Sequence, residues 1–203
     1  AYLDAALDRL GGADRAAADA ALVATEPAPE PASVTAGTRL SDGGWLAELD
    51  AETGDIAALV APDARRIAGV DGCLIGYRHE SYDAAELQKH LDAYLQHRIE
   101  WAILDHDKPG LASAKTARTA RFAGRLLGTS DERTALAELP DEARLLLGGP
   151  RRHALRLTAL GPDRVEIALV LHDKPANRMP EAGFLLVTPQ GARDWTFEKL
   201  GRT

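Results

Sequence analysis

Residues 45–50 read Trp-Leu-Ala-Glu-Leu-Asp, and this stretch decides the fold class of the 203-residue chain. The apolar residues Trp45, Ala47 and Leu49 alternate with Leu46, Glu48 and Asp50. This is the period of a strand with one buried face. Turn sequences flank it on both sides, at Asp42-Gly43-Gly44 and Glu52-Thr53-Gly54. We therefore predict a β meander around these residues.

Further short β-like runs lie before and after this stretch. We predict strands at residues 34–40, 45–49, 56–60, 73–78, 154–160, 164–171 and 183–188. Two packed sheets are the simplest arrangement for such runs. The predicted fold class is mainly β, an antiparallel β-sandwich with a short N-terminal helical segment and a partly helical insertion.

The first residues have a different pattern. Residues 1–24 are predicted to form two short alanine-rich helices broken at Gly11-Gly12, with Asp14 capping the second. The chain starts with helical spacing, so we expect it to begin inside an element of a longer protein, and residues 1–25 to end a helical bundle. Prolines between residues 26 and 32 predict a linker, and residues 33–203 are expected to form the β-sandwich domain.

The predicted insertion spans about residues 83–150. Asp83, with Glu86 three residues later, resembles a capping box at the start of a helix. Residues 111–150 are the least strand-like, and helices are predicted at 131–138 and 141–147, the latter ending at Gly148.

Composition excludes several classes of protein. The formal net charge of −7 argues against a nucleic-acid partner, and the arginines between Arg118 and Arg152 are interpreted as a solvated face because carboxylates are interspersed among them. The only cysteine, Cys73, rules out an intramolecular disulfide. No apolar run approaches the ~20 residues of a membrane span. We expect a soluble chain with no membrane partner; its compartment stays open, with the cytoplasm slightly favoured.

The residues that could carry chemistry form no complete catalytic motif. Asp105 and Asp107 would share a side of an extended chain, as a pair of glycosidase carboxylates could, but two turn aspartates before Lys108 are the favoured interpretation. The pairs His79-Glu80, His106-Asp107 and His172-Asp173 lack the spacing of a specific zinc site, so no metal ligands are assigned. Cys73 lies in an apolar run and is predicted to be inert.

The loop at residues 174–182 is the most informative segment. It reads Lys-Pro-Ala-Asn-Arg-Met-Pro-Glu-Ala between two predicted strands. Asn177 and Arg178 could donate hydrogen bonds to a hydroxyl-rich ligand, or Arg178 could pair with Glu181 and only fix the loop. The tetrapeptide His-Asp-Lys-Pro occurs at 106–109 and again at 172–175, either by coincidence or because two loops meet at one place.

The motifs at Glu48 to Ile56, Tyr77 to Tyr82, Asp105 to Gly110 and Lys174 to Ala182 together resemble a known group of proteins. The chain is similar to the C-terminal region of alpha-mannosidase-like proteins, a domain-of-unknown-function family related to glycoside hydrolase family 38. The resemblance covers about residues 1–200, and its strongest motif is the run at 174–182. The residues His106-Asp107 depart from it, since an aromatic residue and a glycine are expected before Lys-Pro-Gly.

The resemblance implies a parent protein with an upstream catalytic domain, a helical bundle and a mannosidase-like C-terminal β-sandwich. Its zinc ligands and nucleophilic aspartate belong to the catalytic domain, so this chain is expected to hold no cofactor and no catalytic residue. The residues implied in substrate binding are Lys174, Asn177, Arg178, Glu181, Asp105 and Lys108.

Two functions from different classes remain. The first is an accessory domain that stabilises the catalytic domain of the same polypeptide and lends substrate contacts. The alternative is a stand-alone carbohydrate-binding or protein-interaction β-sandwich, for which an exposed Trp45, Trp101 or Trp195 could stack on sugar rings; the few aromatic residues favour core positions for these tryptophans. A self-contained hydrolase using Asp105, Asp107 and a histidine ranks last.

Overall fold

The computed structural model describes the chain except residues 1, 26–28, 98, 192–195 and 197–203, and the side chains of residues 24, 25, 102, 104 and 105. The chain divides into two compact units, Ala1–Glu30 and Pro31–Thr203. The boundary falls within the range 26–32 that was predicted as a linker.

The first unit consists of helices. Helix α1 spans Tyr2–Leu7 and helix α2 spans Gly12–Thr25, so the predicted pair of helices is confirmed. Asp14 is not the cap, because α2 already begins at Gly12 and Asp14 lies in its first turn. Arg15 binds Asp19 one turn later and also Asp8, which joins α2 to the turn that follows α1.

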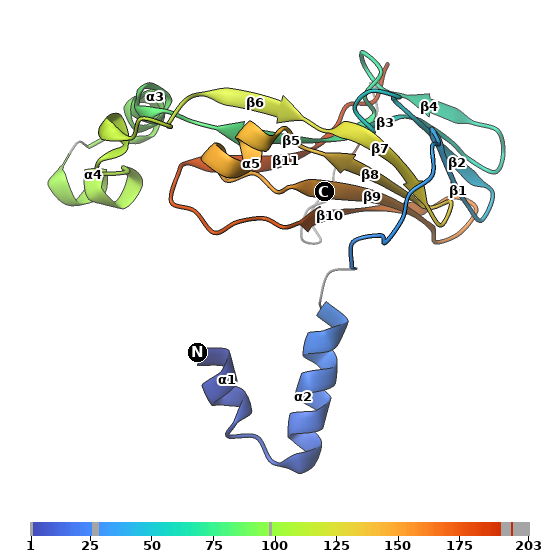
Figure 1. Cartoon of the computed structure of the whole chain (residues 1–203), viewed down its shortest axis with the longest axis horizontal. Coiled ribbons are helices and arrows are strands. Elements are labelled where there is room, and N and C mark those ends of the chain that lie inside the picture. The colour runs from blue at the N-terminus through green and yellow to red at the C-terminus, as the bar shows by residue number, and fades with distance from the viewer. Residues whose placement is uncertain (1, 26–28, 98, 192–195, 197–203) are drawn as a thin grey trace. The chain divides into compact units, whose positions relative to one another are not determined.

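The second unit contains two antiparallel sheets, as predicted for a mainly β chain (Figure 1). In the described residues the larger sheet has seven strands: β1 (Arg39–Asp42), β2 (Trp45–Leu49), β3 (Ile56–Val60), β4 (Arg66–Ala68), β5 (Ile75–Ser81), β6 (Ala120–Ala123) and β11 (Glu181–Val187). The smaller sheet has four: β7 (Arg125–Ser130), β8 (Thr134–Glu138), β9 (Arg152–Ala159) and β10 (Val165–His172).

One hydrophobic core joins the two sheets. The buried side chains of Trp45 and Ile56 from the larger sheet belong to the same cluster as Leu155 and Leu157 from β9. The strand at 45–49 has the predicted burial pattern, with its first, third and fifth residues buried. Trp45 is a core anchor, and its indole N–H donates to the carbonyl of Gly161 at 2.9 Å.

Helices occupy the connections of the second unit. They are α3 (Ala84–Tyr94), α4 (Glu100–His106), the 3₁₀ turn η1 (Leu111–Ser113) and α5 (Asp141–Leu147). The predicted N-cap of α3 is confirmed, since the Asp83 carboxylate accepts from the N–H of Glu86 at 3.0 Å. Glu86 does not complete the capping box; its carboxylate binds Lys89, while the N–H of Asp83 donates to Thr119. Figure 1 places α3 and α4 at one end of this unit.

Residues 111–150 were predicted to be the least strand-like, and only the predicted helix at 141–147, which is α5 and ends at Gly148, is confirmed there. Three strands, β6, β7 and β8, lie in this range, and the predicted helix at 131–138 is strand β8 preceded by a turn. The first predicted strand, at 34–40, is also corrected. The regular strand is β1, and upstream of it Thr35 exchanges two backbone hydrogen bonds with Thr129.

Candidate functional site

The site is built where two connections of the β-rich unit meet. One is the turn at Lys108-Pro109-Gly110 that leads from α4 into η1, and the other is the predicted loop at 174–182 between β10 and β11. A hollow of about 650 Å³ lies between them, a volume within the usual range of ligand pockets. The loops that carry the two His-Asp-Lys-Pro sequences therefore meet at one place, which was one of the two interpretations of that repeat.

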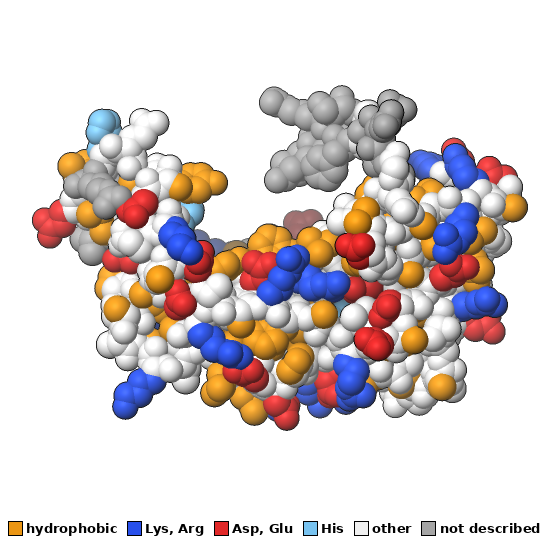
Figure 2. All heavy atoms as spheres, turned by 90° about the horizontal axis from the view of Figure 1, so that it is seen from above, with side chains coloured by type: hydrophobic (Ala, Val, Ile, Leu, Met, Phe, Trp, Pro, Cys, Tyr) orange, Lys and Arg blue, Asp and Glu red, His pale blue; other side chains and the backbone are white. Residues whose placement is uncertain are grey.

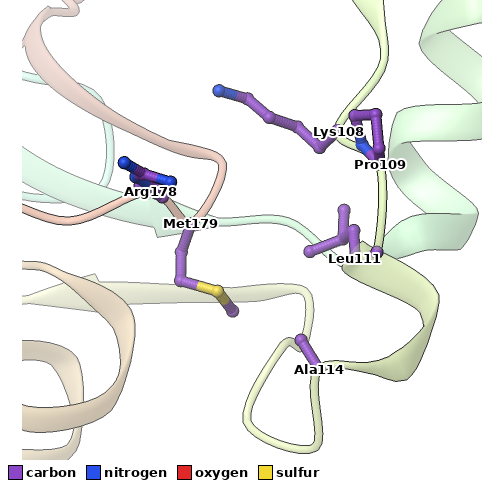
Figure 3. Close-up of a pocket in the computed structure, with 7 residues that line it drawn as sticks. Lys108, Pro109, Leu111, Ala114, Arg178 and Met179 are labelled. Atoms are coloured by element: carbon purple, nitrogen blue, oxygen red, sulfur yellow. The ribbon is translucent and has the colours of Figure 1, made fainter.

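The hollow has a cationic part and an apolar part. Lys108 and Arg178 line it together with Pro109, Leu111, Ala114 and Met179. Figure 3 shows Met179 and Leu111 projecting into the space from opposite sides, with the Lys108 side chain reaching across toward the other loop. The predicted Lys108 and Arg178 thus contribute to one site, whereas Leu111 and Ala114 were not foreseen, because apolar residues in a turn carry no distinctive sequence signal.

Local contacts fix the loop that carries Arg178. The Asn177 side-chain oxygen accepts from the N–H of Met179 at 2.6 Å, so Asn177 builds the turn on which Arg178 sits. The Asn177 amide also lies against Gly148, the left-handed residue that ends α5, with φ of 76°. Asn177 therefore has a structural role in this loop.

Glu181 is held at the base of the loop, away from Arg178. Its carboxylate accepts from Lys174 at 2.6 Å, and its other oxygen lies 3.5 Å from Nδ1 of the buried His79. The predicted alternative, in which Arg178 pairs with Glu181, is wrong, because Glu181 forms its ion pair with Lys174. Lys174 and Glu181 thus close the loop on itself, and Arg178 lies among the residues that line the hollow.

The two aspartates do not form a glycosidase pair on an extended chain. The backbone is helical through α4 up to His106, so the extended geometry assumed for Asp105 and Asp107 is absent, and the Asp105 side chain lies outside the described residues. Asp107 accepts from the N–H of Lys108 at 2.7 Å. This contact supports the interpretation of Asp107 as a turn residue.

A buried polar group lies beneath the loop and was not predicted. Tyr77, His79 and His153 are almost fully buried, and the rings of Tyr77 and His153 lie 4.9 Å apart. Burial, with a smaller effect from Glu181, raises the pKa of Tyr77 to about 12. Burial lowers the pKa of His153 to about 4, with His172 and Arg78 acting in the same direction and Asp55 opposing it. At neutral pH Tyr77 and His153 are therefore uncharged and behave as core residues.

The described residues do not fit a zinc ion. No three of their His, Cys, Asp or Glu side chains converge on a point where a metal could bind. The Nε2 atom of His79 lies 3.1 Å from the Leu147 carbonyl oxygen. Cys73 is half-buried, and its pKa is raised chiefly by burial and secondly by the nearby Asp55. The prediction that Cys73 is a poor nucleophile agrees with this shift.

The arginines between residues 118 and 152 pair with carboxylates. The pairs are Arg118–Glu142, Arg121–Glu80, Arg125–Glu138, Arg133–Asp131, Arg151–Asp173 and Arg152–Glu138. Figure 2 shows cationic and anionic side chains interspersed over one face of the molecule.

Two further predictions concern the remaining tryptophans and the membrane. Trp101 is 66% exposed on α4 and is not a core anchor, while Trp195 lies outside the described residues. Among the helices that the structure describes, none has the length and apolar character needed to cross a bilayer.

Comparisons with known proteins place the chain in a family. The comparisons with curated proteins and with solved structures found no match. A family model described as a domain of unknown function, DUF5054, matches residues 1–168. Because this match covers most of the chain, the protein belongs to the DUF5054 family.

Proposed function

We propose that this chain is the accessory β-rich part of an alpha-mannosidase-like glycoside hydrolase related to glycoside hydrolase family 38. In this role it stabilises an upstream catalytic domain, which would carry the zinc, and contributes contacts to a hydroxyl-rich substrate. This proposal also implies that the two sheets form a β-sandwich of the type found in the C-terminal region of alpha-mannosidases.

The supporting observation is that Lys108 and Arg178 line one hollow. The strongest motif of the resemblance is Lys174 to Ala182. The motif at Asp105 to Gly110, which departs from the family pattern at His106-Asp107, lies 64 positions or more away in sequence, and the two supply opposite sides of that hollow. Lysine and arginine donate hydrogen bonds and cannot accept them, so they are suited to bind the hydroxyl oxygens of a sugar. Lys174, Asn177 and Glu181 hold the loop and support Arg178 indirectly.

The test is hydrolysis of an aryl alpha-mannoside by this chain and by a longer protein that includes the upstream sequence, with and without added zinc. Activity in the longer protein alone, reduced by Arg178→Ala, is the expected result. Arg164→Ala, at an exposed turn residue outside the hollow, is the matched control and should leave the rate unchanged. Turnover by this chain alone would contradict an accessory role, and unchanged kinetics in Arg178→Ala would remove Arg178 from the substrate contacts.

The exposure of Trp101 favours a second candidate function, a carbohydrate-binding module without catalysis. An indole that is 66% exposed can stack on a sugar ring. If this function is the correct one, the chain binds sugars alone and Trp101→Ala weakens that binding, while the longer protein shows no hydrolysis.

A further inference from the structure

Two of the residues that line the hollow between the two loops are cationic. Lys108 and Arg178 both line it, and none of its lining residues is acidic. Within the described part of the chain, neither side chain forms an ion pair. Two cationic side chains at one hollow favour an anionic occupant, because a counter-charge offsets the repulsion between like charges.

This arrangement is unusual for this molecule. The chain has 31 acidic and 24 basic residues, so carboxylates are in excess. Most arginines of the β-rich unit have a carboxylate neighbour, including Arg66 with Glu48 and Arg78 with Asp55. Among the described side chains, none forms an ion pair with Lys108 or Arg178, although acidic residues lie close to both in sequence.

Three described carboxylates close to Lys108 or Arg178 in sequence bind other groups, while the Asp105 side chain lies outside the described residues. Asp107 accepts from the backbone N–H of its neighbour, Glu181 binds Lys174, and Asp173 binds Arg151 at 3.1 Å. The loop at 174–182 therefore satisfies its other charges internally and leaves the guanidinium of Arg178 for a ligand.

The two cations offer complementary donors. A guanidinium presents a planar fork that matches two oxygens of a carboxylate or phosphate, and an ammonium acts as a point charge. Leu111 and Met179, which project into the same space, provide apolar contact for the body of the ligand. A ligand with an oxyanion group and a compact body suits this lining better than a neutral sugar does.

We propose that the hollow binds the oxyanion of an anionic sugar, a phosphate ester or a uronic carboxylate, through Lys108 and Arg178. The sugar identity rests on the proposed function, whereas the charge of the ligand rests on the lining of the hollow. Preference for an anionic sugar would distinguish this site from a site that binds only the hydroxyl groups of a sugar.

The experiment is titration calorimetry of the full chain with mannose 6-phosphate, mannuronate, mannose and inorganic phosphate. We expect either anionic sugar to bind at least about tenfold more tightly than mannose, because charge-assisted hydrogen bonds are stronger than neutral ones. Comparison of the phosphate with the carboxylate tells which oxyanion the site prefers. Raising the salt concentration should weaken binding, because exposed charges are screened.

Variants assign the effect to the two cations. Lys108→Ala and Arg178→Ala should each weaken binding of the preferred anionic sugar by about fivefold, and Arg178→Glu should abolish it. Lys115→Ala removes an exposed cation that follows the lining residue Ala114 and should change the affinity by less than about twofold. All three positions are exposed, so folding of the four variants should persist, and circular dichroism checks this.

The outcomes separate the two proposals. Equal binding of mannose and the anionic sugars would overturn the anionic site and leave the sugar-binding function standing. Binding of inorganic phosphate as tight as that of mannose 6-phosphate would retain the anionic site and count against a sugar ligand. Loss of affinity in Lys115→Ala equal to that in Arg178→Ala, or no binding of any probe, would overturn the anionic site.

Discussion

Asp55, which directly precedes β3, forms a bidentate ion pair with Arg78 of β5. The two guanidinium nitrogens lie 3.0 and 2.6 Å from the carboxylate oxygens, and the side chains are 3% and 15% exposed. Asp55→Ala leaves a largely buried guanidinium without its counter-charge, and we expect a loss of about 3 kcal/mol of unfolding free energy. Urea denaturation measures it.

An exposed ion pair provides the control for this variant. Glu48 binds Arg66 at 2.6 Å, but both side chains are substantially exposed. Glu48→Ala should cost less than about 1 kcal/mol. Equal costs for Asp55→Ala and Glu48→Ala would show that burial does not govern the Asp55–Arg78 pair.

His153 is expected to make stability depend on pH. Burial lowers its pKa in the folded chain to about 4, whereas the unfolded value is near 6.5. The unfolded chain therefore binds a proton first as the pH falls, so protonation of His153 destabilises the fold between about pH 6.5 and 4. The full effect amounts to roughly 3 kcal/mol.

Comparison of variants isolates this effect from other titrations. Urea denaturation at pH 7 and pH 4.5 should show a smaller loss of stability for His153→Leu than for the unmodified chain. His106→Leu replaces an exposed histidine and should keep the unmodified pH dependence. An unchanged pH dependence in His153→Leu would mean that His153 gains a proton in the folded state as easily as in the unfolded chain.

At the scale of elements, Gly148, which ends α5, packs against Asn177 of the loop that carries Arg178. Its φ of 76° is left-handed, and an added Cβ would lie 1.9 Å from the side-chain nitrogen of Asn177. Gly148→Ala should therefore cost more than the ~1–2 kcal/mol of left-handed strain alone. It should also displace the loop and weaken ligand binding in the hollow.

Gly72 is the matched control for this substitution. Its φ of 77° is nearly the same, but an added Cβ would have no neighbour within 4 Å. Gly72→Ala should show the backbone strain without a collision and without an effect on the hollow. If the two alanine variants are equally stable in thermal denaturation, the contact between Gly148 and Asn177 does not constrain the loop.

Strand β8 shows why part of the fold escaped prediction from sequence. The strand at 45–49 was predicted because its residues alternate in the sequence with a period of two. In the structure the same residues alternate between buried and half-exposed. In β8, Thr134 to Ala137 are all buried, so alternation is lost, and Ala and Leu favour a helix locally. The preceding turn uses positive φ at Asp131 and Glu132, where a glycine would have signalled a hairpin.

The site was predictable only in part. Arg178 was selected because it lies in a polar, proline-containing loop, and Lys108 because of the family resemblance; the structure places both on one hollow. The role of Glu181 depends on His79 and Lys174, and the burial of His153 depends on packing of β9 against β5. Such long-range contacts leave no local sequence pattern.

At the scale of the whole molecule, the division into two units predicts that residues 31–203 fold independently. Both sheets and their shared core belong to this unit. Helix α1 has no buried residue, and Tyr2 is 96% exposed. A chain of residues 31–203 should therefore unfold within about 2 °C of the full chain in a thermal scan.

A slightly shorter chain tests where the β-rich unit begins. Starting at residue 38 removes Thr35, whose N–H and carbonyl each bond to Thr129 at 2.9 Å. Loss of these two hydrogen bonds should cost about 1–3 kcal/mol and lower the midpoint by several degrees. An equal midpoint for the two shortened chains would show that the Thr35–Thr129 pairing adds nothing to the unit. A large drop already in residues 31–203 would mean that α1 and α2 stabilise the sheets, because they would then supply burial that the second unit lacks on its own.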